Sequence, residues 1–469
     1  MQRRQLLMLA LASLGVSACK TQSGYSAVFD EPPRPATATA SPVVAATPVG
    51  TPSSWQSPRI AATTLERAAA SPTPVSRPAA VPTSGPLAGA RERLLVRQAG
   101  ASAPLVGVDV ATGATAFTVP ADLATPDGQH WIGLRPAGGA TAVTLYAARD
   151  GSPLRTFSAP GRYSQGAVAH DSQRLLLAAP PAAGAVHPVS EVALIDLTTG
   201  AVVLHTSLPG RYHADTIDGA GKALYLIADH PERLHNAYEV TRYDLVTKQV
   251  ISVADKRSSQ SIMSGYKVSQ VWSKTGEWLY SLYLSPGADG AFIHALNLPN
   301  RFAACIDLPS GNASEAQLQQ YALAIAPAGD RVFAVNPAIS VINSFSVGDF
   351  SATTVWLLLP NGSKVSGATV SRPVNNCLVT PDGATLYAGT AQGILVLPAT
   401  KADLRPTSVL LAGQSVSSLG MNAGGTLLFA LVDGVQRRLL ALDPTSGAVR
   451  GDLSGSVAQP AGIEQVVPA

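Results

Sequence analysis

The chain has 469 residues, of which 13% are charged, 41 are glycine and 36 are proline, and its formal net charge is only +3. A charged fraction well below the usual value of about 25%, together with so many turn-forming residues, favours a secreted protein built from many short strands. The small net charge and the lack of a long Lys/Arg run argue against a nucleic-acid partner.

Residues 1–18 have the pattern of a signal peptide. A basic start at Arg3 is followed by an apolar run of eleven residues that ends at Val16 and is too short to span a bilayer of about 30 Å. The stretch Val16-Ser-Ala-Cys19 resembles a bacterial lipobox, which implies that Cys19 becomes the lipidated first residue of a segment covering 19–30. The alternatives are an ordinary secretory signal, in which Cys19 is incidental, and twin-arginine export.

The composition changes in residues 31–88, where twelve prolines stand among Ala, Thr, Ser and Val. Such a segment cannot pair strands or bury enough apolar surface to offset the entropy of ordering it. We therefore expect a disordered tether. It would hold the following domain away from the lipid surface.

Turn motifs recur through the rest of the chain, residues 89–469, and predict its fold. Asp-x-x-Thr/Ser-Gly is found at 109–113, 196–200 and 443–447, and Thr-Pro-Asp-Gly at 125–128 and 380–383. Two tight turns in each unit of about 40 to 50 residues are typical of a four-stranded antiparallel propeller blade. The sequence therefore predicts an all-β chain that forms a single β-propeller.

Aligning the turns divides this domain into eight blades of about 47 residues, with seven blades as the alternative. The four strands of a blade are called a to d, from the central channel outward. The expected inner strands begin near Leu123, Tyr163, Tyr212, Tyr266, Tyr321, Val374, Val416 and Ala461. The expected outer strands cover roughly 114–119, 154–158, 202–207, 249–253, 301–308, 353–359, 407–411 and 448–453.

The two ends of the domain predict how the ring closes. Residues 93–119 contain three strand-like runs, enough for strands b, c and d of a blade but not for strand a. Residues 461–467 supply the missing inner strand, and the apolar Ile463, Val466 and Val467 suit that place. Pairing the last strand with the first three removes an exposed sheet edge. A frayed C-terminal tail is the alternative.

The stretch from Cys377 to Thr390, with its Thr-Pro-Asp-Gly turn and following Leu-Tyr strand, resembles the bacterial YVTN and WD40-like β-propeller superfamily. The resemblance implies architecture rather than activity, because its motifs are turn chemistry. Asp-x-x-Thr-Gly also occurs in quinoprotein propellers, where a tryptophan usually stands four residues after the glycine. Here Phe117, Leu204 and Gly451 stand at that place, so no cofactor is expected.

One repeated motif is not explained by turn formation alone. Pro-Gly-Arg-Tyr occurs at 160–163 and again at 209–212, both times where the outer strand of one blade leads to the inner strand of the next. These d-to-a connections share a face with the b-to-c loops. The side chains expected to bind a ligand around the channel on this face are Arg162, Tyr163, Arg211, Tyr212, His213, Tyr266, Lys267, Tyr321 and Arg372.

Aromatic rings and cationic groups together can stack on and hydrogen bond to an anionic or sugar-containing ligand. In the alternative interpretation, the tyrosines wedge between blades and the arginines are solvated. No catalytic residues and no metal site are expected, because the few His and Asp residues fall in different repeats without a nucleophile elbow or metal-ligand spacing.

The expected function follows from these features together. The sequence predicts a lipid-anchored, extracytoplasmic, monomeric propeller of the bacterial cell envelope, which acts as a binding or scaffolding module for a protein or an envelope polymer. The alternative, implied by the resemblance, is a propeller hydrolase such as a lactonase with its active site at the channel mouth.

Overall fold

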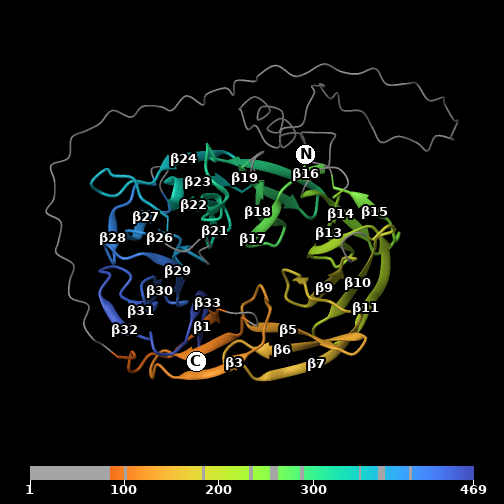
Figure 1. The fold of residues 1–469 in the computed structure, drawn as a ribbon, viewed down its shortest axis with the longest axis horizontal. Helices are drawn as coiled ribbons and strands as arrows, with labels where there is room; N and C mark the ends of the chain where they lie inside the picture. The colour runs from red at the N-terminus through yellow and green to blue at the C-terminus, as the bar shows by residue number, and fades with distance from the viewer. Residues whose placement is uncertain are drawn as a thin grey trace, which may run out of the picture. The chain divides into compact units, whose positions relative to one another are not determined.

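The computed structural model describes residues 85–99, 103–181, 185–231, 236–253, 262–285, 290–347, 350–367, 375–400 and 404–469. The predicted signal peptide, the lipidation residue Cys19, nearly all of the predicted tether and Arg372 lie outside these ranges. The described residues form eight antiparallel sheets arranged as the blades of a ring (Figure 1). The predicted all-β propeller with eight blades is confirmed.

The strands of the first four blades follow, each from the inner to the outer edge. Blade 1 has β33 (Pro460–Pro468), β1 (Glu92–Gln98), β2 (Leu105–Asp109) and β3 (Thr115–Val119); blade 2 has β4 (Leu123–Ala124), β5 (His130–Ala137), β6 (Ala140–Ala147) and β7 (Pro153–Pro160). Blade 3 has β8 (Gly166–Val168), β9 (Arg174–Ala179), β10 (Val189–Asp196) and β11 (Val202–Pro209); blade 4 has β12 (Tyr212–Ile217), β13 (Ala223–Asp229), β14 (Ala237–Asp244) and β15 (Val250–Ser252), with β16 (Ile262–Ser264) also paired to β14.

The remaining blades have the same order. Blade 5 has β17 (Tyr266–Trp272), β18 (Trp278–Ser285), β19 (Gly290–Asn297) and β20 (Phe302–Leu308); blade 6 has β21 (Ala322–Ile325), β22 (Arg331–Asn336), β23 (Val341–Ser346) and β24 (Ala352–Trp356). Blade 7 has β25 (Cys377–Val379), β26 (Thr385–Thr390), β27 (Gly393–Pro398) and β28 (Ser408–Leu410); blade 8 has β29 (Val416–Met421), β30 (Leu428–Val432), β31 (Arg438–Leu442) and β32 (Val449–Asp452). Two short helical turns, α2 (Glu315–Leu318) and η2 (Pro337–Ile339), lie in blade connections.

The ring closes through the C-terminal strand, as predicted. Strand β33 pairs antiparallel with β1 from Glu92 opposite Pro468 to Gln98 opposite Pro460, and it supplies the inner strand of blade 1. The propeller's contacts begin slightly earlier than residue 89, because Leu87 packs against the core between blades 8 and 1 and its N–H donates to Val110 O over 3.0 Å.

The core is divided between the blades. Each of the eight hydrophobic clusters of the described residues joins two neighbouring blades, because both faces of every sheet are covered. In one of them, Ile132 and Leu134 of blade 2 meet Leu175 and Leu177 of blade 3. Within the described ranges, no helix is both long and apolar enough to cross a membrane.

In three blades the first residue of the c-to-d turn is an aspartate whose side chain accepts hydrogen bonds from N–H groups of the same turn. In blade 3 the Asp196 carboxylate accepts bonds of 2.8 Å from the N–H groups of both Thr198 and Thr199, and Gly200 closes the turn at a φ of +79° that favours glycine. Asp443 does the same in blade 8, and Asp109 accepts from the Thr112 N–H in blade 1. The aspartates that open these three turns are therefore occupied by the fold.

Candidate functional site

The opposite face of the ring is called the connector face, because it carries the d-to-a connections (120–122, 161–165 and 210–211 among them) and the b-to-c loops. A buried hydroxyl fixes each Pro-Gly-Arg-Tyr connection. Thr141 Oγ1 donates to Gly161 O over 2.9 Å and accepts from the Tyr163 N–H over 2.8 Å. Ser190 Oγ makes the same two bonds, of 2.9 and 2.8 Å, to the second connection. The two connections therefore have the same backbone support.

Three of the predicted tyrosines pack between blades. Tyr163, Tyr212 and Tyr321 are 3%, 9% and 3% exposed and belong to the clusters between blades 2 and 3, 3 and 4, and 5 and 6. Burial, with a smaller effect of the Glu191 carboxylate, raises the pKa of Tyr163 to about 12. Their rings offer no free face to a ligand. The expected stacking role does not fit these three side chains, and the wedging alternative does.

The other predicted residues near the channel are partly exposed and have partners. The Tyr266 hydroxyl donates to Glu315 Oε1 over 2.6 Å. His213 Nε2 lies 2.7 Å from Asp229 Oδ2, and His213 Nδ1 lies 3.3 Å from Gln165 Oε1. The two His213 contacts join inner strand β12 to the connection at 161–165 and to the end of β13 in the same blade. The Tyr266 contact joins β17 to α2.

Lys267 is neutralised by a buried carboxylate that sequence analysis did not assign to the site. Asp215 is 3% exposed and its Oδ1 accepts from Lys267 Nζ over 2.9 Å and from Gln270 Nε2 over 2.8 Å. Asp215 stands at a break in the β12–β13 register, between Ala214 and Thr216. Such a bulge turns a side chain out of the regular alternation, which explains why strand periodicity did not place it.

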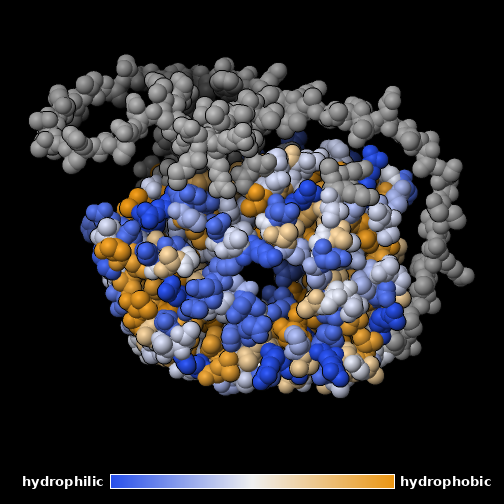
Figure 2. Space-filling model, turned by 180° about the vertical axis from the view of Figure 1, so that it is seen from behind, coloured by the Kyte–Doolittle hydropathy of each residue, from blue (hydrophilic) through white to orange (hydrophobic). Residues whose placement is uncertain are grey.

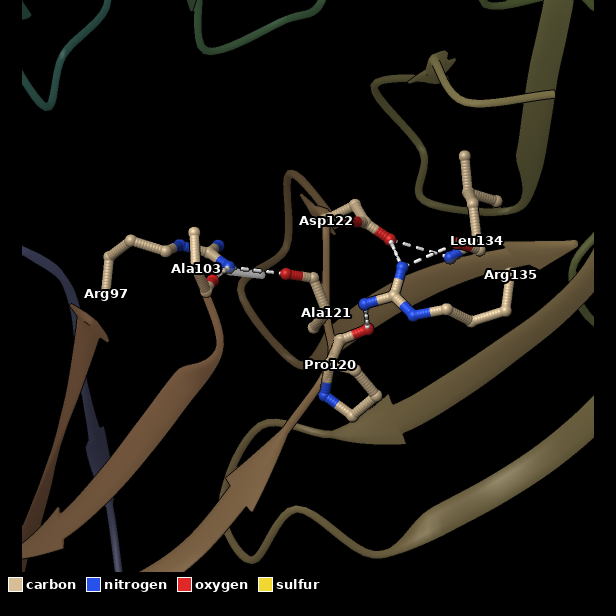
Figure 3. A network of polar contacts seen from close by, with 7 residues as sticks. All are labelled: Arg97, Ala103, Pro120, Ala121, Asp122, Leu134 and Arg135. Atoms are coloured by element: carbon tan, nitrogen blue, oxygen red, sulfur yellow. Dashed lines mark hydrogen bonds and ion pairs between the residues drawn. The ribbon is translucent and has the colours of Figure 1, made fainter. Parts of the chain in front are cut away.

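A polar network between blades 1 and 2 was also missed (Figure 3). The Arg97 guanidinium pairs with Glu464 Oε1 of the closing strand over 3.2 Å. It also donates to the carbonyls of Ala103 and Ala121, as Figure 3 shows. Asp122 Oδ2 accepts from the Leu134 N–H over 2.7 Å and from Arg135 Nη1 over 2.8 Å. Arg97 of β1 contacts both the closing strand β33 and the connection at 120–122, and Asp122 pairs with Arg135. These charged side chains are therefore largely occupied. Figure 2 shows hydrophilic residues bordering the central opening on the face it presents.

Arg162 differs from the other predicted cations. Its side chain is exposed, and in the described part of the chain no hydrogen bond or ion pair holds it. It lines a shallow hollow of about 460 Å³ between blades 2 and 3, together with Gly139, Gly161, Ala179, Val189, Glu191 and His205. Arg211, by contrast, is half-buried and donates to Pro181 O over 3.2 Å.

The described residues contain no group of three or more His, Cys, Asp or Glu side chains placed to hold a metal ion. The predicted Cys19 and Arg372 are outside the described ranges, so their roles stay predictions. Of the eight predicted ligand-binding residues that the structure describes, Arg162 is the accessible and unpaired charge. Glu191 and His205, which share its hollow, carry no repeat motif that would have singled them out.

Comparisons with known proteins identify no family for this chain. No protein-family model matches it, and no curated protein matches it either. The likeness to YVTN and WD40-like repeats therefore stays a prediction at the level of the family.

Solved structures with similar folds include several propellers. The Pseudomonas aeruginosa periplasmic gluconolactonase is 16% identical, with 80% of this chain and 98% of that chain covered at a TM-score of 0.39. The Bacteroides fragilis putative 6-phosphogluconolactonase is 15% identical, covering 74% and 100% at 0.40. Porphyromonas gingivalis dipeptidyl peptidase 4 is 14% identical, covering 70% and 52% at 0.46. At these values the likenesses carry no argument about activity or site.

Proposed function

We propose that this protein is a lipid-anchored, extracytoplasmic β-propeller that acts as a binding module for a protein or an envelope polymer through its connector face. The lipid anchor rests on Val16-Ser-Ala-Cys19, and the binding role rests on the propeller. Propellers present rigid loop surfaces around a ring, so ligands bind without a large ordering cost.

The single observation that carries the choice of face is the unpaired Arg162. On the turn face, Asp109, Asp196 and Asp443 are each bonded to the N–H groups of their own turns. On the connector face, Arg162 extends from a connection whose backbone is fixed by Thr141, and its guanidinium is exposed. An exposed guanidinium with free donors on a fixed backbone suits a carboxylate or phosphate, which it binds through two parallel bonds.

The test uses a charge-removing variant and a matched control. Arg162→Ala should weaken binding to envelope fractions or arrayed glycans by about tenfold to a hundredfold, the value of one charge-assisted contact, and Arg162→Ala with Arg211→Ala should abolish it. The control is Arg155→Ala, which removes an exposed arginine from outer strand β7. Binding should also weaken with salt. Equal binding by the double variant and the parent would remove this face as the site.

A hydrolase with its active site at the channel mouth is the second candidate, and one contact favours it. His213 lies 2.7 Å from Asp229, the arrangement in which a carboxylate orients an imidazole to act as a general base. His213→Asn would abolish hydrolysis of a lactone panel if this pair were catalytic. Hydrolysis that is absent from the parent, or that is unaffected in the variant, rejects the hydrolase.

A further inference from the structure

The Tyr–Glu arrangement at Arg162 is repeated in the next blade, and the two copies differ in whether the glutamate has a hydrogen-bond partner. Glu191 lies beside Tyr163 in blade 3, and Glu239 lies beside Tyr212 in blade 4, each near the start of strand c and each raising the pKa of its tyrosine after burial. Glu239 is satisfied internally, because it accepts from Ser252 Oγ and lies 3.3 Å from a nitrogen of His230.

The copy in blade 3 is open. Glu191 is exposed, and no hydrogen bond or ion pair is formed by its carboxylate in the described ranges. Arg162 and Glu191 line the same hollow of about 460 Å³ without pairing with each other. Two opposite charges therefore face one space.

A glycine lets Glu191 and Tyr163 pack closely against the backbone of the connection. Gly161 has a φ of +101°, and a Cβ there would come within 2.6 Å of Glu191 Oε2 and 2.8 Å of the Tyr163 hydroxyl. Any larger residue would clash with these two side chains and be strained in the backbone as well. Both oxygens therefore lie against Gly161, which itself lines the hollow.

The Tyr163 hydroxyl is a second, independent sign of a missing partner. Its ring is 3% exposed and its oxygen has no hydrogen-bond partner. Burying a hydroxyl without a partner is unfavourable, because its hydrogen bonds to water are lost and not replaced. A small group that bonds to it at Gly161 would recover that energy.

We propose that this hollow binds a small zwitterion, of the size of an amino acid or dipeptide, whose ammonium group bonds to Glu191 and the Tyr163 hydroxyl while its carboxylate bonds to Arg162. The inference rests on the proposed binding function and specifies the ligand class of that face. A purely anionic ligand would meet Glu191 as well as Arg162, and a purely cationic ligand would meet Arg162 as well as Glu191. A ligand that carries both charges satisfies both side chains.

Calorimetry with three matched probes tests this directly on the full-length protein in detergent. The probes are L-alanyl-L-alanine, its N-acetyl derivative and its C-terminal amide. The free dipeptide should bind at least about tenfold more tightly than either blocked form, because each block removes one charged contact. No binding of the free dipeptide at millimolar concentration, or equal binding of all three probes, overturns the proposal.

Variants test which side chain binds each charged end of the dipeptide. Glu191→Gln should remove the preference for the free amine, and Arg162→Ala the preference for the free acid, each with about a tenfold loss for the dipeptide. Glu239→Gln, in the filled copy, is the matched control and should bind the dipeptide like the parent. Dipeptide binding that survives Glu191→Gln, or that is lost equally in Glu239→Gln, contradicts the assignment.

Tyr163→Phe separates binding from folding. Removing a buried hydroxyl that has no partner should leave the melting temperature unchanged or slightly raised, while dipeptide affinity falls several-fold. Lower stability with unchanged affinity would mean that the hydroxyl acts only in the fold. If dipeptide binding fails but the double arginine variant still loses its envelope ligand, the zwitterion is wrong and the proposed function stands.

Discussion

Deleting residues 459–469 should unfold or oligomerise the propeller, because this removes strand β33 and reopens the ring. Ile463 and Val467 are 1% and 6% exposed and belong to the cores on either side of blade 1, the first between blades 8 and 1 and the second between blades 1 and 2. Burial of two such side chains contributes about 3–6 kcal/mol in total. That is a large share of a stability of about 5–15 kcal/mol, before the loss of the β1 pairing is added.

Point variants calibrate this expectation. Ile463→Ala keeps the β33–β1 ladder and should lower the free energy of unfolding by about 2–5 kcal/mol while the protein stays monomeric. Val435→Ala, at a fully exposed side chain, is the control and should change stability by less than about 0.5 kcal/mol. Denaturant unfolding gives the free energies, and light scattering after gel filtration gives the oligomeric state.

The decisive comparison is between the deletion and the point variant. The deletion exposes the edge of β1, and an unpaired edge recruits strands from other chains. We therefore expect dimers or aggregates from the deletion and none from Ile463→Ala. A deletion variant that remains monomeric with the parent's unfolding midpoint would refute the inference that β33 holds the ring closed.

Two further predictions concern the anchor and the turns. Cys19→Ala should move the protein from the detergent-extracted membrane fraction to an uncleaved or soluble form, and unchanged fractionation with no lipid on residue 19 would reject the lipoprotein interpretation. Hydrogen bonds from Thr198 and Thr199 lower the pKa of Asp196 to about 2, below its unfolded value near 4, so the stability it contributes is present above pH 4 and is lost as the pH falls toward 2. The melting temperature of Asp196→Asn should therefore fall less than the parent's between pH 5 and pH 2, and parallel curves would contradict this.

Turn chemistry made most of the fold predictable. The expected inner strands at Tyr212, Tyr266 and Val416 begin where β12, β17 and β29 begin. The expected strand at Tyr163 begins three residues late, at Gly166 in β8. The Thr141 and Ser190 hydroxyls support the two connections in the same way, so the repeated turn motif does not by itself fix where the inner strand starts.

Some turns were obscured because their glycine is replaced. Lys248, Arg301 and Phe350 close c-to-d turns at φ values of +59°, +58° and +56°, where Gly200 stands in blade 3. These residues adopt the left-handed backbone because the surrounding pairing enforces it. In these blades the repeat is recognised from the spacing of the strands and not from a turn glycine.

The candidate site was less predictable, for a geometric reason. Neighbouring residues such as Arg162 and Tyr163 differ completely in exposure, the first being open to solvent and the second 3% exposed. In a propeller both faces of each blade are buried, so alternation along the chain does not say which residue reaches the surface. Glu191 escaped notice because the hollow depends on two blades at once.

The closing strand also determines when the protein can finish folding. Arg97 and Glu464 meet in blade 1 although 367 residues separate them in the chain. Of the strands of the ring, β33 leaves the ribosome last, so blade 1 begins with the earliest strands of the ring and is completed only by the final one. Contacts of such long sequence separation form slowly, and the ring stays open until β33 has been made.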